Sequence, residues 1–178
     1  EVPVGDAARL GRYLDRIKEI KMFKYLNPED LNLLLGEAEV VHYAPGDQII
    51  SQGGLSEYLF VVLAGSVEVS IQDDKGKSVF VCKIDREDVF GEGAIFISQK
   101  RTASVTSAEP STMLRIHRSD ILYFIKQRPK GGIKLLMLII NSLLNKLRKA
   151  NLEIVLEKGS DINLDNIDPL IREIMDQQ

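Results

Sequence analysis

The chain has 178 residues, of which 44% are hydrophobic and 28% are charged, as in an ordinary globular domain. Its formal net charge of −3 argues against a nucleic-acid-binding module, which usually carries a basic face. The single cysteine, Cys82, excludes an intramolecular disulfide and a cysteine-rich metal site, so a cytoplasmic location is expected. No stretch reaches the roughly 18 consecutive apolar residues of a membrane span, and none is expected.

The first 38 residues predict an N-terminal helical unit. Residues 7–22 repeat apolar side chains at helical spacing, which is typical of an amphipathic helix. Asn27 is a suitable N-cap for a second helix over 28–36, because Pro28 would occupy its first turn and acidic residues follow.

Residues 39–118 change to short runs with β character. Turn residues such as Gly, Pro and Asp separate these runs. Many short strands with frequent turns predict an antiparallel roll or barrel, so the fold class is expected to be α+β with a jelly-roll-like β-roll. The predicted strands cover 39–43, 48–51, 58–63, 66–72, 78–84, 102–107 and 112–117.

Residues 119–157 return to the helical pattern. Ser119 is a possible cap for a helix over 120–127, and the Gly131-Gly132 pair leads into a long helix over 133–157. Apolar residues of the long helix alternate at spacings of three and four, which is typical of a coiled-coil seam. This seam either joins two copies in a homodimer, the favoured interpretation, or packs within the chain. Its residues are Ile133, Leu136, Ile140, Leu143, Leu147, Ala150 and Ile154. Residues 158–178 predict an acidic tail with one short helix over 166–175.

Residues 90–105 read FGEGAIFISQKRTASV and place Glu92 and Arg101 among small side chains. An Arg guanidinium binds phosphate oxygens in a forked geometry, and the hydroxyl of Thr102 stands beside it. An ionised Glu accepts hydrogen bonds and suits a sugar hydroxyl. A short helical turn between them would add backbone amides for an anion. These features indicate a pocket for a compact ribose phosphate; the alternative is a simple ion pair at the neck of a loop.

The motif Gly91-Glu92-Gly93-Ala94, followed by Arg101-Thr102-Ala103, resembles the phosphate-binding cassette of cyclic nucleotide-binding domains. The similarity extends over roughly residues 20–157, and it includes the turns at Pro45-Gly46 and Gly65-Ser66. The resemblance implies a β-roll with N-terminal helices, a short cassette helix and a long C-terminal helix. It also implies a cyclic nucleotide ligand with no further cofactor or metal. The long helix resembles that of the catabolite-activator branch, which dimerises through it.

The resemblance also implies individual roles in ligand binding. Glu92 would accept a hydrogen bond from the ribose 2′-hydroxyl, and Arg101 would pair with the cyclic phosphate. Val69 and Val81 would form apolar walls near the base, and Asn151 on the long helix would contact the base edge. The other implied site residues, around the phosphate, are Gly91, Gly93, Ala94, Thr102 and Ala103.

The sequence departs from the family pattern at three positions. Gly54 stands where Glu is frequent, Glu87 where Gly is common, and Gly93 where a larger apolar residue is usual. None of these changes removes a charged contact to the ligand. The apolar walls accept either purine, and cAMP is favoured over cGMP.

The implied function is a regulatory sensor that moves its flanking helices on binding a cyclic nucleotide and thereby acts on an unknown effector protein. The alternative is a ligand-free interaction or dimerisation module with the same fold. No enzymatic activity is expected, because His42 and His117 lack a catalytic or metal-binding spacing. No direct DNA binding is expected, because few residues follow Glu157 and they are acidic. The chain starts at Glu1 without Met, so it is either a stand-alone sensor or the sensing part of a longer protein.

Overall fold

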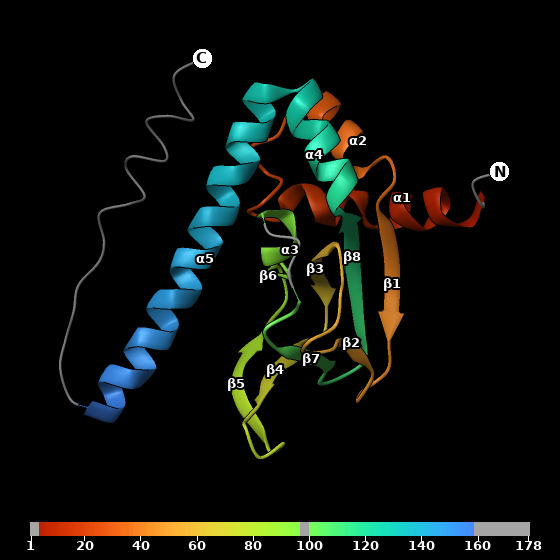
Figure 1. The fold of residues 1–178 in the computed structure, drawn as a ribbon. Helices are drawn as coiled ribbons and strands as arrows, with labels where there is room; N and C mark the ends of the chain where they lie inside the picture. Colours follow the sequence, from red (N-terminus) through yellow and green to blue (C-terminus); the bar gives the residue numbers. More distant parts are fainter. Residues whose placement is uncertain (1–3, 97–99, 159–178) are drawn as a thin grey trace.

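The computed structural model describes residues 4–96 and 100–158, and it has the predicted α+β architecture with an antiparallel β-roll (Figure 1). The helices are α1 (Val4–Glu19), α2 (Pro28–Leu35), α3 (Gly93–Phe96), α4 (Arg118–Gln127) and α5 (Pro129–Lys158). The strands are β1 (Glu39–Tyr43), β2 (Gln48–Ile50), β3 (Tyr58–Ala64), β4 (Val67–Gln72), β5 (Ser78–Ile84), β6 (Val89–Phe90), β7 (Ser104–Ser107) and β8 (Ser111–His117). The sequence pattern had not predicted the short strand β6.

The strands of the described chain form two four-stranded sheets, in the orders β1-β8-β3-β6 and β2-β7-β4-β5. All their pairings are antiparallel. Apolar side chains of both sheets meet inside the roll, where Phe60 stacks on Phe90 with ring centroids 5.0 Å apart. The other buried members of this cluster are Ile50, Val62, Val67, Ile84, Val105 and Met113.

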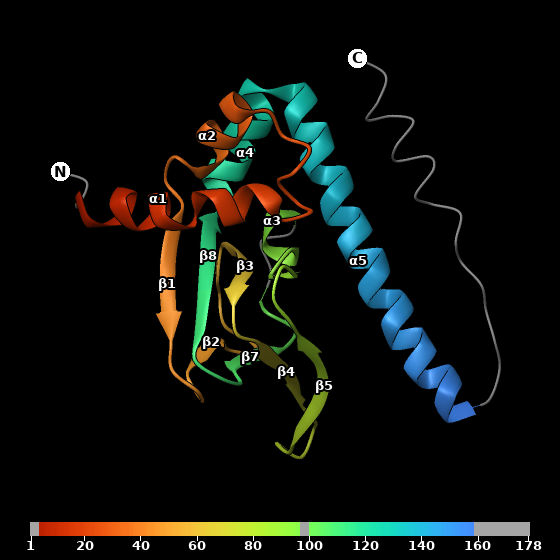
Figure 2. The same cartoon turned by 180° about the vertical axis from the view of Figure 1, so that it is seen from behind.

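Strand β3 is buried on both faces because helices cover the outer face of its sheet. Side chains alternate along a strand, so Phe60 and Val62 belong to the cluster inside the roll, whereas Leu59, Val61 and Leu63 belong to a second cluster. This second cluster includes side chains of α1, α2, α4 and the start of α5. Figure 2 shows α1 crossing this face of the sheet. The helices are thus anchored to the back of the roll.

Helix α5 begins at Pro129, four residues before the predicted start, because Gly131 and Gly132 lie inside the helix rather than before it. A Cβ at position 131 would lie 2.5 Å from Oδ2 of Asp30, and one at position 132 would lie 2.9 Å from Cα of Ile125. The two glycines therefore allow close contact between α5 and the other helices. Helix α4 is also capped differently from the prediction, by the side chain of His117 rather than by Ser119.

Only the first part of α5 is buried by apolar contacts, through Leu135, Leu138 and Ile139. Beyond this point the helix runs along one side of the roll (Figure 1). Four residues of the predicted seam are between 40% and 57% exposed, namely Ile133, Ile140, Leu143 and Leu147. The side chains of Ala150 and Ile154, and the tail predicted for 159–178, lie outside what the structure describes. Among the described helices, none is long and apolar enough to cross a membrane.

Candidate ligand-binding site

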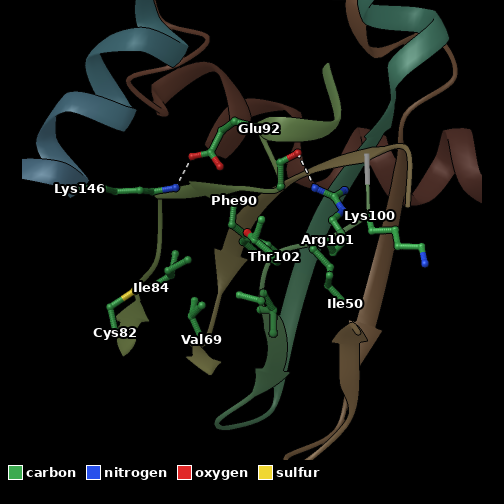
Figure 3. A pocket seen from close by; sticks show the side chains of 14 residues that line it. Ile50, Val69, Cys82, Ile84, Phe90, Glu92, Lys100, Arg101, Thr102 and Lys146 are labelled. Carbon is green, nitrogen blue, oxygen red and sulfur yellow. Dashed lines mark hydrogen bonds and ion pairs between the residues drawn. The ribbon is translucent and has the colours of Figure 1, made fainter. Parts of the chain in front are cut away.

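A cavity of about 330 Å³ opens between the β-roll, the segment around α3 and helix α5 (Figure 3). Its walls come from β2, β4, β5, β6, β7 and the residues on either side of α3. One end is polar and the floor is apolar. The lining residues are Ile50, Val69, Cys82, Ile84, Phe90, Gly91, Glu92, Gly93, Lys100, Arg101, Thr102, Ala103, Val105 and Lys146.

Gly91 sets the position of Glu92 at the start of α3. Its φ of 81° lies in the left-handed region, and a Cβ there would come within 2.8 Å of the Tyr58 carbonyl oxygen. Glycine is the residue that tolerates both conditions. The chain therefore turns sharply after β6, and Glu92 is buried, with 7% of its surface exposed.

The guanidinium of Arg101 lies beside this turn and is held by the protein backbone. Nη1 donates to the Gly91 carbonyl at 3.0 Å, and Nη2 donates to the Tyr58 carbonyl at 2.8 Å and to Oγ of Ser56 at 3.2 Å. Nε is buried and has no partner among the described residues. Burial lowers the pKa of Arg101, and the nearby charge of Glu92 raises it in part. A partly buried guanidinium with an unpaired donor is suited to an anionic oxygen.

Glu92 pairs with a residue that the sequence analysis did not assign to the site. Its Oε1 accepts a hydrogen bond from Nζ of Lys146 on α5, and Lys146 also donates to the Val89 carbonyl. Arg101 and Glu92 thus have separate partners in the described structure, unlike the ion pair of the alternative interpretation. A signal for Lys146 was present in the sequence, since Asn141, Ser142, Asn145 and Lys149 give α5 a second, polar face that includes it.

The apolar wall of the cavity contains Val69 of β4 and, from the neighbouring strand β5, Cys82 instead of Val81. Val69 pairs with Cys82, but the next pair is Ser70 with Phe80, so an extra residue forms a bulge at Val81. Residues directly opposite in an antiparallel pair point to the same face, so Cys82 shares the cavity face with Val69. Val81 is 42% exposed and does not line the cavity. The wall role implied for Val81 is therefore not supported by the structure.

The other residues named from the sequence are placed as follows. Gly93, Thr102 and Ala103 line the cavity, and Lys100 lies exposed at its rim. Ala94 lies in α3 and Asn151 in α5, but their side chains are outside the described part of the structure. Glu87, which stands where the family commonly has Gly, has a φ of 72°. Its backbone thus has the left-handed conformation that glycine adopts without strain.

Comparisons with known proteins agree with this geometry. The family model for the cyclic nucleotide-binding domain matches residues 40–128. The cGMP-dependent protein kinase of Plasmodium berghei is 28% identical over 64% of this chain and 14% of its own length. The cyclic AMP receptor protein of Thermus thermophilus is 29% identical over 78% of this chain and 62% of its own length. The chain thus spans less than two thirds of each of these relatives.

Solved structures share the fold. A cyclic nucleotide-binding domain from Methylobacillus flagellatus superposes with a TM-score of 0.73 at 20% identity and covers 90% of both chains. The regulatory subunit of a cAMP-independent protein kinase A from Trypanosoma brucei gives 0.65 at 21% identity, over 86% of this chain and 53% of that one. Fold and cavity together define a β-roll with flanking helices and a cavity beside the segment around α3. The chain belongs to the cyclic nucleotide-binding domain family.

Proposed function

We propose that the cavity binds a cyclic nucleotide and that the chain acts as a regulatory sensor, not as an enzyme. The observation that carries this proposal is that Arg101 lines the cavity and has one buried N–H group, at Nε, without a partner among the described residues. A buried donor without an acceptor costs on the order of 1–3 kcal/mol. An anionic ligand that binds beside the guanidinium would offset this cost once a small local shift brings one of its oxygens to Nε.

The cavity suits the three parts of such a ligand. Its volume of about 330 Å³ lies within the usual range for small-molecule sites. The cyclic phosphate would bind at Arg101 and the ribose hydroxyl at Glu92, with Thr102 close to the phosphate. The base would then lie against the apolar wall of Val69 and Cys82. This wall is compatible with both purines, and the preference for cAMP over cGMP stays a prediction.

The ligand-free interaction module fits these observations less well. The contacts of Arg101 within the chain could serve such a module, but they leave its Nε without a partner, and both Arg101 and Glu92 line the cavity, where a ligand-free module has no use for them. The pairing of Glu92 with Lys146 connects the cavity to α5, which supports a site whose occupancy is felt by that helix. Ligand would bias the position of that helix by its different affinity for the two arrangements.

The exposed apolar seam of α5 supports a homodimer. Ile133, Ile140, Leu143 and Leu147 recur with coiled-coil spacing, and no described part of this chain covers them. A second copy of α5 would bury this face. The moved helices would present a changed surface to an effector protein. A cytoplasmic location completes the proposal.

Calorimetric titration with cAMP and with cGMP tests the proposal, using the wild type and Arg101→Ala. The matched control is Arg12→Ala, which removes an exposed arginine of α1 that does not line the cavity. Binding that is lost in Arg101→Ala and kept in the control would support the site. Absence of heat and of a thermal shift with both nucleotides at millimolar concentration would overturn it in favour of the interaction module.

A further inference from the structure

The ammonium group of Lys146 enters the ligand cavity from α5, on the side opposite Arg101 (Figure 3). A lysine ammonium has three N–H donors. Two of them have acceptors, namely Oε1 of Glu92 and the carbonyl of Val89. The side chain of Lys146 is 31% exposed and that of Glu92 is 9% exposed, so their ion pair is partly buried. Lys146 is therefore bound to Glu92 of the cassette and to the backbone of β6 before any ligand arrives.

Glu92 keeps a free oxygen in this arrangement. Lys146 occupies Oε1, and no described residue donates to Oε2. An ionised carboxylate has acceptor capacity for about four hydrogen bonds over its two oxygens. One carboxylate can thus accept from the ammonium and from a sugar hydroxyl at the same time.

We propose that Lys146 is a positioning residue for ribose recognition: it holds Glu92 so that the second carboxylate oxygen accepts the 2′-hydroxyl of the nucleotide. The inference rests on the proposed function of the cavity. It assigns to α5 a part in ligand recognition, through a residue for which neither the motif nor the comparisons gave a role.

The charge of Lys146 supports the same role. Glu92 is buried, and a cyclic phosphate that binds at Arg101 brings a second negative charge into the same cavity. An uncompensated buried carboxylate would repel that phosphate. Lys146 neutralises Glu92, so the cavity can hold a carboxylate for the sugar and an arginine for the phosphate side by side.

The contact to the Val89 carbonyl argues that Lys146 stays in place when ligand binds, rather than competing with the ribose for Glu92. This carbonyl belongs to β6, which pairs with the central strand β3. The ammonium is thus bound to the rigid sheet as well as to the carboxylate. A lysine held only by Glu92 would be displaced by the sugar, and its removal would then improve binding.

The test compares Lys146→Met with the wild type, using cAMP and its 2′-deoxy analogue as probes in calorimetric titrations. Methionine keeps most of the side-chain length and removes the charge. Lys149→Met is the matched control, because it removes a lysine of the same helix that contacts Asp88 at 4.0 Å and does not line the ligand cavity. The wild type should prefer cAMP to the 2′-deoxy analogue. Lys146→Met should reduce that preference about tenfold, as expected for one misaligned hydrogen bond to a charged group.

Two further measurements separate positioning from other effects. In a Glu92→Gln background, Lys146→Met should leave the preference for the 2′-hydroxyl unchanged, since the two residues act on the same contact. Lys146→Arg should restore part of it. Equal weakening of both nucleotides by Lys146→Met would mean a general structural or electrostatic role, and tighter binding of cAMP would mean competition; either result overturns the inference. A wild type that binds neither nucleotide would instead overturn the proposed function, and the inference with it.

Discussion

Replacing Arg101 by lysine should destabilise the protein even without ligand. The guanidinium connects the Gly91 turn, the Tyr58 carbonyl on β3 and the Ser56 side chain with two nitrogens. A lysine has a single nitrogen on a flexible stem and cannot reproduce that fork. We expect it to keep one of the three bonds. Lysine keeps the positive charge of arginine, so the effect of the substitution reports on the forked geometry of the guanidinium and not on its charge.

The size of the effect follows from the bonds lost. Each net hydrogen bond contributes about 1 kcal/mol, and somewhat more when the donor is charged. Two lost bonds at a half-buried site predict a decrease of about 2 kcal/mol in the free energy of unfolding. Affinity for the nucleotide should fall by about 100-fold or more, because the cassette is loosened and the forked phosphate contact is lost.

Urea denaturation of the ligand-free protein gives the stability, and calorimetric titration gives the affinity. The midpoint of unfolding should shift to lower urea with little change in the slope, as for a local loss of contacts. Arg12→Ala serves again as the control. A lysine variant as stable as the wild type, with unchanged nucleotide affinity, would refute the view that Arg101 holds this part of the roll together.

Three other substitutions test the fold and the assembly. Gly131→Ala should destabilise the protein although Ala favours helices, because the new Cβ would collide with the side chain of Asp30. We expect the free energy of unfolding, measured by urea denaturation, to fall by about 1–3 kcal/mol and the thermal midpoint to fall with it. A stabilised variant would contradict the close packing of α5 against Asp30. Glu87→Gly should raise the free energy of unfolding by up to about 1 kcal/mol in the same assay, because glycine adopts the left-handed backbone conformation at this position without strain. A loss of stability would mean that the side chain of Glu87 stabilises the fold by more than the backbone strain costs. The double variant Ile140→Glu, Leu147→Glu should sediment as a monomer in sedimentation velocity runs, because the two charges would interrupt the apolar seam. Its circular dichroism spectrum should be retained, because these side chains are 50% and 57% exposed and contribute little to the core. A mass equal to that of the wild type would argue against dimerisation through the seam.

The sequence predicted the β-roll and the short helix of the cassette because both depend on local signals. Gly91 and the capping Asn27 act within a few residues of their own positions, and Asn27 accepts from the amide of Asp30 at 2.7 Å as expected. Turn residues marked nearly every strand end. Strand β6 was missed because it has two residues, too few for any periodicity to appear.

The features that the sequence did not predict depend on contacts between distant segments. Lys146 is 54 residues from Glu92, and the polar face of α5 that includes it does not indicate which residue it pairs with. The bulge at Val81 has no glycine or proline to mark it, so the switch to Cys82 became visible only in the strand register. Gly131 and Gly132 resembled a helix break, but they are required by the close approach of Asp30 and Ile125. Each of these features depends on a contact that the fold creates, so the local sequence around the residue could not predict it.

Beyond Ile139, helix α5 turns a polar face toward the rest of the chain and leaves apolar side chains uncovered, which is the reverse of an ordinary surface helix. Beyond Ile139 its contacts with the roll include the polar links of Lys146 and Lys149. The nucleotide and a second copy of the chain would therefore contact opposite faces of α5. If the nucleotide changes the dimerisation constant by some factor, thermodynamic linkage requires that dimerisation changes the affinity for the nucleotide by the same factor. The apparent affinity for nucleotide would depend on how concentrated the protein is.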